Sequence, residues 1–570
     1  MNPQGKNKKI QKKKQQNSPP LPLIEKQAVP KWIWIALGVV LLTTLAIYFR
    51  TLSYDLLTHW DDKSYVTDNE HIRGLKWENI KLFFTEYYAG NYQPVTILMY
   101  ALEYKFAGAD GSLYHLNNLL LHLLNTLLVF VFVRKISPQN AYAALITAAF
   151  FAVHPMHVES VAWVSERKDV LYTFFFLISL IIYSDYLRTQ KNKHLILSSV
   201  FYVLSCLSKP AAVILPLVLL LIDYYAGRKF SKKIILEKLH FFLIAFVIGL
   251  VTVKAQGEAL HNTSSVPFIQ HFSMVTFAFI TYIAKAFVPV NLSAIYPYPV
   301  DYGGNLSPLY YLTIAVAGLI LYFVWHSRKW GKEIIFGFLF FLITIILVLQ
   351  LKRVGGVTLS ERYTYVPYIG IFFILGRLFE NHADTAKGKL KKYKNYLLAF
   401  LVVCFALFSI LTYLRVQIWE NDRLLFSDVI KKYPDCGTPH YLLGDHYLDR
   451  AAVVADSANK DSNLKQSAAN YQDALKCPMN KADKAMVHFN KGCAEFMMKN
   501  FQAAYEDFDA AVKLNPKNSL AYGNRGTARY QLGDLQGALQ DYNKAIELNP
   551  QYTDAINNRE NVKQMLGIKN

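Results

Sequence analysis

Two adjacent carboxylates, Asp61 and Asp62, come shortly after the first long apolar run of the chain. Adjacent carboxylates could share a metal ion, or one could act as a general base while its neighbour orients it or raises its pKa. The pair could equally belong to a solvated loop in which Asp62 caps a helix. The spacing alone leaves both interpretations open.

Histidines with helical spacing follow. His115, Asn118 and His122 fall on one side of a predicted helix, because side chains separated by three, four or seven residues share a face. Polar groups in lipid often form hydrogen bonds between helices, and from the spacing alone we favour that role. His115 remains a secondary site candidate.

A second group of possible ligands lies in one short loop. His154, His157 and Glu159 occur in the stretch His154-Pro155-Met156-His157-Val158-Glu159. Their order resembles a metal-ligand set only loosely. All three are secondary site candidates, and the sequence leaves open whether a divalent cation takes part.

Basic side chains gather in the segments that separate later apolar runs. Arg and Lys suit a phosphate group, whereas a carboxylate suits the removal of a hydroxyl proton. Ionisable groups at a membrane edge are costly unless paired, so they mark a site or a salt-bridge network. The alternative is a set of isolated anchors for anionic lipid headgroups. The candidate phosphate-binding residues are Arg167, Lys168, Lys209, Arg353 and Arg362, with the carboxylate Glu361 next to Arg362.

The segments that must position these residues are apolar runs, which fill the first two-thirds of the chain. Of the 570 residues, 53% are hydrophobic and 18% are charged, below the roughly 25% usual for soluble domains. A membrane span needs about 20 mostly apolar residues. The sequence therefore predicts an all-α polytopic membrane bundle of about eleven spans. These spans are 33–49, 113–133, 141–153, 169–187, 193–207, 210–226, 236–254, 308–326, 334–351, 363–380 and 395–414.

Positive charge predicts the orientation of the bundle. The net charge of +20 is concentrated in the N-terminal tail and in short links between apolar runs, which is the positive-inside pattern and not a nucleic-acid-binding face. We expect a cytoplasmic tail over 1–31, a transmembrane domain over 32–415 and an external loop over 51–112. Residues 269–288 are apolar enough to cross, but a crossing would move the basic link at 328–332 outside. We therefore expect an interfacial or re-entrant helix there.

A 34-residue period marks residues 416–570 as a separate helical domain. Asn490, Asn524 and Asn558 recur at this spacing, as do the pairs Asn515-Pro516 and Asn549-Pro550. The period is that of tetratricopeptide repeats, which stack helix pairs into a solenoid. Such an array offers a concave groove for a peptide or protein, or serves as a scaffold or dimerisation surface.

The order of the motifs carries a family resemblance. Together they resemble the transmembrane and tetratricopeptide-repeat O-mannosyltransferases, of the GT-C class of membrane glycosyltransferases, over about 32–565. The chain departs from this family in Ser208-Lys209-Pro210, since many relatives have an acidic residue after the lysine, and it carries fewer repeats than animal members. The motifs are Trp60-Asp61-Asp62, Tyr92-Gln93-Pro94, Tyr114-His115-Leu116-Asn117, His154-Pro155-Met156-His157-Val158-Glu159, Ser208-Lys209-Pro210, Pro289-Val290-Asn291-Leu292-Ser293 and Glu361-Arg362-Tyr363-Thr364-Tyr365-Val366-Pro367.

The resemblance implies a GT-C fold and a defined reaction. A sugar, with mannose expected, moves from a polyprenyl-phosphate donor to a Ser/Thr hydroxyl of a protein acceptor, with inversion at the anomeric carbon. Asp61 or Asp62 inherits the role of catalytic base. The donor phosphate is expected at Arg167, Lys168, Lys209, Glu361 and Arg362, and the repeats, on the periplasmic or lumenal side, are expected to hold the acceptor.

Two other functions compete with this one. A non-enzymatic membrane scaffold would gather envelope proteins through the repeats and would have no need of the Asp pair. A flippase or transporter of lipid-linked sugars would show internal repeats among its spans and ionisable groups at mid-membrane, and neither is evident in the sequence.

Overall fold

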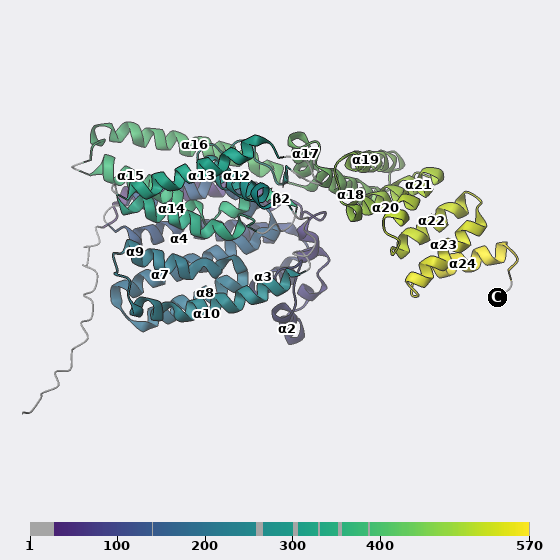
Figure 1. The fold of residues 1–570 in the computed structure, drawn as a ribbon, viewed down its shortest axis with the longest axis horizontal. Helices are drawn as coiled ribbons and strands as arrows, with labels where there is room; N and C mark the ends of the chain where they lie inside the picture. Colours follow the sequence, from purple (N-terminus) through teal and green to yellow (C-terminus); the bar gives the residue numbers. More distant parts are fainter. Residues whose placement is uncertain are drawn as a thin grey trace, which may run out of the picture.

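The apolar runs and the repeats form two helical parts. The computed structural model describes residues 28–138, 141–257, 266–299, 306–328, 331–351, 356–385 and 388–568. Figure 1 shows a helical bundle and, extending from one end of it, an elongated array of shorter helices. The only strands among the described residues are β1 (Tyr296–Pro297) and β2 (Val357–Leu359), which pair antiparallel. The all-α prediction is confirmed.

Each predicted span corresponds to a helix of the bundle. The bounds differ from the predicted ones by a few residues, as expected where a helix extends past the apolar core of its sequence. The helices are α1 (Lys31–Tyr48), α4 (Gly111–Ile136), α5 (Tyr142–Val153), α7 (Arg167–Thr189), α8 (Asn192–Ser208), α9 (Leu215–Tyr225), α10 (Lys232–Ala255), α13 (Pro308–Ser327), α14 (Lys332–Ile345), α15 (Tyr368–Phe379) and α16 (Lys394–Ile418).

The count of about eleven spans is not confirmed by helix length and composition. Six stretches of the described chain are long and apolar enough to cross a membrane, and α5 with the short helix beyond Pro155 makes a seventh, bent by 58°. The other predicted spans fall on helices of 11 to 17 residues, such as α9 and α8. At 1.5 Å per residue these are shorter than a hydrocarbon core of about 30 Å, so the number of crossings stays a prediction.

The basic links between helices meet at one end of the bundle. Lys135 at the end of α4 pairs with Asp185 of α7, and Arg188 donates to the Lys135 carbonyl oxygen at 2.5 Å. Arg377 of α15 donates to Ser137 Oγ at 2.7 Å. We call this the basic end. The repeat array leaves the opposite end, which we call the repeat end (Figure 1).

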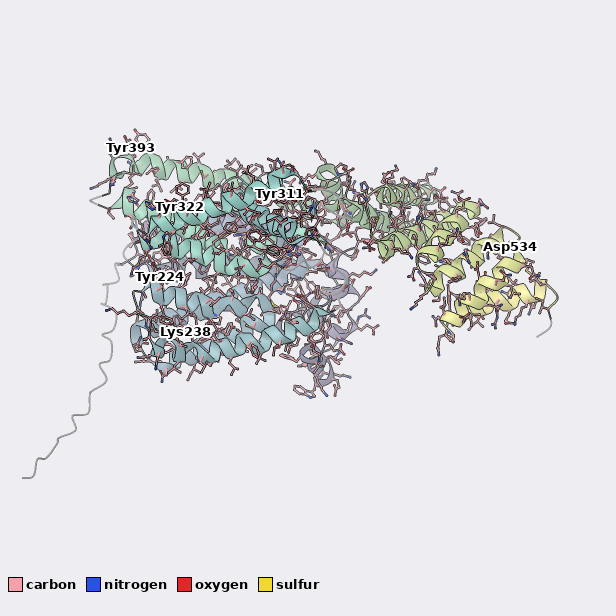
Figure 2. All side chains as sticks on the ribbon, in the orientation of Figure 1. Tyr224, Lys238, Tyr311, Tyr322, Tyr393 and Asp534 are labelled. Carbon is pink, nitrogen blue, oxygen red and sulfur yellow. The ribbon has the colours of Figure 1, made fainter. Side chains whose placement is uncertain are left out.

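Side chains labelled in Figure 2 show how α13 runs between these ends. Tyr311 lies toward the repeat end, whereas Tyr322, Tyr224 and Tyr393 lie toward the basic end. Helix α13 therefore enters the bundle at the repeat end and leaves it at the basic end.

Helix α12 (Phe268–Lys285), which covers most of the ambiguous segment 269–288, stays at the repeat end. Its His271 Nε2 lies 3.0 Å from the Leu351 carbonyl oxygen, and its Tyr282 hydroxyl donates to the Ser360 carbonyl oxygen at 3.2 Å. Figure 1 shows α12 beside β2, close to the repeat array. Since α10 ends beside Gly90 of the first loop and α13 also starts at the repeat end, α12 does not carry the chain across the bundle. This agrees with an interfacial or re-entrant helix, whose position in a bilayer stays a prediction.

The first loop, residues 51–112, folds over the repeat end. It contains α2 (Trp77–Thr85) and α3 (Pro94–Ala107) and short helical turns at Phe49–Ser53, Lys63–Thr67 and Glu70–Arg73. Its own apolar core includes Tyr65, Ile97 and Tyr100, which pack against Val164. The loop is thereby fixed to the segment that carries Glu166 and Lys168.

The repeat array begins with α17 (Asp422–Lys432) and continues as stacked helix pairs. Small residues lie where paired helices cross closely: a Cβ at Gly492 would come within 2.8 Å of the Phe508 ring. The pairs are α18 (Gly437–Val453) with α19 (Ser457–Lys476), α20 (Lys481–Met497) with α21 (Phe501–Leu514), and α22 (Ser519–Gln531) with α23 (Leu535–Leu548), followed by α24 (Thr553–Met565).

Candidate functional site

The two adjacent aspartates have different environments. Asp62 is fully buried, and both of its carboxylate oxygens accept hydrogen bonds. Oδ2 accepts from the Leu57 amide at 2.8 Å, and Oδ1 accepts from the Ser165 amide at 2.8 Å and from the Ser165 hydroxyl. Burial raises the pKa of Asp62 to about 7, although these hydrogen bonds favour the ionised form. Asp62 therefore ties the first loop to the start of α7.

Asp61 is the more accessible carboxylate of the pair. Its side chain is half-buried, and the described residues show no hydrogen bond to it. The negative charge of Asp61 acts to raise the pKa of Lys168 and of Tyr65. The centroid of the Tyr65 ring lies 5.1 Å from Lys168 Nζ. The backbone before Asp61 is held by Trp60, which stacks on Trp163 with 4.2 Å between ring centroids. Asp61 is thus a carboxylate in a fixed segment that has no hydrogen-bond partner among the residues the structure describes.

Three of the predicted cations surround one buried carboxylate, Glu166. Its Oε1 lies 3.0 Å from Lys168 Nζ and 3.2 Å from Arg362 Nε, and its Oε2 lies 3.6 Å from Lys209 Nζ. The cations come from distant parts of the chain, namely the start of α7, the end of α8 and the turn that begins at Glu361. Packing of these elements at the repeat end brings them together.

Two further carboxylates complete the cluster. Lys209 Nζ lies 2.5 Å from Asp169 Oδ1, and Glu159 pairs with the Arg362 guanidinium and accepts from the Arg362 amide at 3.0 Å. These charges raise the pKa of Arg362, even though burial acts in the opposite direction. We call Glu159, Glu166, Asp169, Lys168, Lys209 and Arg362 the charge cluster.

The charge cluster is layered by depth. The side chains of its carboxylates are at most 3% exposed, whereas those of Lys168, Lys209 and Arg362 are 10%, 15% and 17% exposed. The buried carboxylates therefore hold the cations from the protein side, and the cations lie nearer the surface. Such an arrangement can present fixed positive charge to an anion without leaving a buried charge unpaired.

Arg167, predicted with the cations, does not join them. It is fully buried and pairs with Glu103 of α3, and it donates to Asn118 and, at 2.5 Å, to the Tyr114 carbonyl oxygen. These contacts fix α3 and α4 to the start of α7. Arg353 lies outside the described residues.

Glu361 also faces a different partner. Its Oε1 lies 3.3 Å from Arg415 Nη2 of α16 and accepts a hydrogen bond from the Tyr296 hydroxyl at 2.9 Å. Arg415 also pairs with Asp428 of α17, with 3.1 Å between Arg415 Nη1 and Asp428 Oδ2. Burial raises the pKa of Glu361 to about 7, against the effect of Arg415. This pair links the bundle to the first helix of the repeat array.

The predicted histidine candidates are buried among other groups. His154 Nδ1 accepts from the Met156 amide at 3.2 Å, and His157 Nδ1 lies 2.8 Å from the Phe151 carbonyl oxygen. His115 is buried beside the Tyr54 ring, with 6.2 Å between centroids. Among the described residues these three do not form a group with metal-ligand spacing.

Sequence reasoning did not select Glu166 or Asp169 as site residues. The signal was present, because both flank Lys168 in the stretch Ser165-Glu166-Arg167-Lys168-Asp169. Cations at the start of an apolar helix require partners, and the neighbouring carboxylates can supply them.

Comparisons with known proteins identify the repeats. Residues 485–518 and 519–552 each match a family model described as "Tetratricopeptide repeat". The repeat prediction is confirmed for α20 to α23.

The relatives cover different shares of this chain. A protein O-mannosyl-transferase of Caenorhabditis elegans is 24% identical over 463 residues, which cover 77% of this chain and 62% of that protein. The human protein O-mannosyl-transferase TMTC2 is 31% identical over 155 residues, 26% of this chain and 18% of its own. The human TMTC4 protein is 30% identical over 201 residues, 31% of this chain and 26% of its own.

The resemblance to O-mannosyltransferases is confirmed by these names. This chain spans less than two-thirds of the length of each of these relatives.

Solved structures show only a low overall likeness to this chain. The crystal structure of MamA covers 25% of this chain at 20% identity with a TM-score of 0.22, and the first tetratricopeptide domain of RPAP3, bound to an HSP90 peptide, covers 22% at 26% identity with a TM-score of 0.19. These scores are too low for a shared overall fold.

Proposed function

We propose that this chain is a membrane glycosyltransferase that moves a sugar, with mannose as the expected one, from a polyprenyl-phosphate donor to a Ser/Thr hydroxyl of a protein. Two lines support the proposal. Relatives of this chain are named protein O-mannosyl-transferases, and one of them matches 77% of it. At the repeat end, the half-buried carboxylate of Asp61 lies near a group of cations whose side chains are 10–17% exposed.

The observation that carries the proposal is the difference between Asp61 and Asp62. A hydroxyl is a poor nucleophile at neutral pH, and a carboxylate within hydrogen-bond reach can accept its proton as the new bond forms. Asp62 has both oxygens occupied by protein donors, whereas Asp61 is available. Asp61 is therefore the proposed general base, and Asp62 positions it.

The proposed step is a single displacement. The acceptor oxygen bonds to the anomeric carbon while the bond from that carbon to the phosphate oxygen breaks. The hydroxyl proton passes to Asp61, and the electron pair of the broken bond leaves with the polyprenyl phosphate. Attack on the face opposite the leaving group inverts the anomeric carbon. Lys168, Lys209 and Arg362 stabilise the phosphate as it gains charge, which is the effect of any preorganised group of cations.

The proposed orientation of the protein in the membrane rests on the difference between the basic end and the repeat end. The basic end is proposed to face the cytoplasm, by the positive-inside rule, so the repeat end, the charge cluster and the array face the lumen or periplasm. The groove of the repeats is proposed to hold the acceptor near Asp61.

Transfer of a labelled sugar tests the proposal. Purified full-length chain in detergent receives labelled mannosyl polyprenyl phosphate and a candidate acceptor, and the label on protein is counted. Asp61→Asn should lower transfer about 10²–10⁴-fold, whereas substitution of Asp68, a surface aspartate of the same loop with 60% side-chain exposure, by Asn should not. Transfer at the parent rate by Asp61→Asn would favour the scaffold alternative.

A further inference from the structure

A cavity lies at the junction of the first loop with the repeat array, outside the charge cluster. Its volume is about 620 Å³, and its lining includes residues of the first loop, α17 and α18. Figure 1 shows α17 and α18 where the array meets the bundle. His59, His446 and the aspartates Asp422 and Asp449 converge on this cavity. The proposed transfer reaction uses none of them.

Three of these side chains form the one group of metal-ligand type found among the described residues. Ligand atoms of His59, Asp422 and His446 all lie within 4.8 Å of one another. His59 Nδ1 is 2.6 Å from Asp422 Oδ2, and His446 Nδ1 is 4.0 Å from the same oxygen. The two imidazole rings meet edge to face, with 5.5 Å between centroids.

Two polar atoms of this group lack a protein partner. Asp422 is 5% exposed, yet its Oδ1 has no hydrogen-bond partner among the described residues, and the same holds for the buried His446 Nε2. A buried carboxylate oxygen without a donor costs free energy, so it indicates a cation or a donor that the chain itself does not supply.

A fourth residue, Asp449, contacts the ring nitrogen of His59 that does not face Asp422. His59 Nε2 lies 3.2 Å from Asp449 Oδ2, while its Nδ1 faces Asp422. In metal sites, a ligating histidine almost always donates its other ring N–H to a carboxylate or carbonyl, which fixes the tautomer and strengthens the ligand. The relation of Asp449 to His59 matches that arrangement.

We propose that His59, Asp422 and His446 bind one divalent transition-metal ion, with Zn²⁺ as the best match, and that Asp449 orients His59. Two imidazole nitrogens and one carboxylate oxygen are a ligand set that suits Zn²⁺, whereas Mg²⁺ and Ca²⁺ prefer oxygen ligands alone. Three protein ligands leave a fourth position for water from the cavity.

The ion would join parts of the chain that are far apart in sequence. His59 belongs to the first loop, close to Asp61, whereas Asp422 and His446 belong to α17 and α18. A bound ion stabilises the folded state by favouring it over any state in which the ligands separate. The site would thus fix the repeat array against the first loop, and this role does not depend on the proposed transfer reaction.

Metal binding by the full-length protein tests the proposal directly. The protein is purified in detergent, stripped with a chelator and titrated with Zn²⁺ by calorimetry, and with Co²⁺ by visible absorption. We expect one Zn²⁺ per chain, a rise in melting temperature on binding, and the intense absorption of four-coordinate Co²⁺. Failure of the unmodified protein to bind either ion overturns the proposal, whatever the variants do.

Variants place the ion at this group. His446→Gln should abolish binding, and Asp449→Asn should weaken it by about 10- to 100-fold, the usual effect of removing an outer-shell carboxylate. The matched control is His488→Gln, which removes another histidine–aspartate pair of the array, 2.9 Å from Asp507, and should leave affinity unchanged. Equal affinity in His446→Gln and the parent would place the ion elsewhere and contradict the proposal. Circular dichroism confirms that each variant is folded.

Discussion

At the scale of single residues, the adjacent aspartates have separate tasks. Asp62 receives three hydrogen bonds from Leu57 and Ser165 and is buried, whereas Asp61 remains accessible beside Lys168. Because adjacent side chains point in different directions, a pair of carboxylates in sequence need not form a pair in space. One residue of the pair maintains the structure around the other.

Asp62→Asn should destabilise the protein, whereas Asp61→Asn should not. The asparagine has one acceptor oxygen in place of two, so its NH₂ group would face the Leu57 or the Ser165 donors. Leaving a buried donor unpaired costs about 1–3 kcal/mol. Melting temperatures of the two variants, compared with the parent in the same detergent, check this. Equal loss in both variants would mean that Asp61 also has a structural role.

Arg362→Ala should weaken binding of the donor. Loss of one charge-assisted contact corresponds to roughly 1.5–3 kcal/mol, about tenfold to a hundredfold in affinity. Titration with a non-hydrolysable donor analogue measures it. The single variant also leaves Glu159 buried without its cation, which could cost about 3–5 kcal/mol of stability.

The double variant Arg362→Ala with Glu159→Gln separates these effects. The glutamine carbonyl can still accept from the backbone amide of residue 362, and no unpaired buried charge remains. Stability should recover while donor affinity stays low. Recovery of both would assign Arg362 to a salt bridge and remove it from the donor site.

At the scale of elements, the periodic patterns were predictable from sequence and the pairings were not. Apolar runs and the 34-residue period predicted the helices and the repeats, because burial of one helical face depends on local spacing. The partner of Arg167 is Glu103, which lies in a different element, so no local pattern separates Arg167 from Lys168. Likewise, Glu361 faces Arg415 and not the charge cluster.

The short helices explain why the span count remained a prediction. Helices such as α9 and α15, of 11 and 12 residues, are apolar; α9 follows a 3₁₀ turn at Pro210–Ile214, and α15 continues into a π-helical turn at Glu380–Asp384. Hydropathy cannot distinguish a short crossing helix from a buried core helix. The path of the chain at either side of α12 is better evidence, since α10 ends and α13 begins at the same end of the bundle.

At the scale of the whole molecule, the chain has a basic end and a repeat end. If the structure spans a membrane along this axis, the link at 228–231 and helix α24 of the repeat array must lie on opposite sides. A reporter inserted after Lys229 should read cytoplasmic, and a reporter fused after Asn570 should read external. Two readings from the same side would show that a segment assigned to one end crosses the bilayer.

The central claim is that Asp61 accepts the proton of the acceptor hydroxyl during sugar transfer. The most direct measurement is the rate of label transfer from mannosyl polyprenyl phosphate by purified Asp61→Asn, with Asp68→Asn as control and donor affinity measured in parallel. Substitution by asparagine keeps the size of the side chain and removes the base, which typically lowers the rate 10²–10⁴-fold. The account predicts a loss of that order with unchanged donor affinity and folding, and a parent rate for the control. Transfer by Asp61→Asn at the parent rate would contradict it.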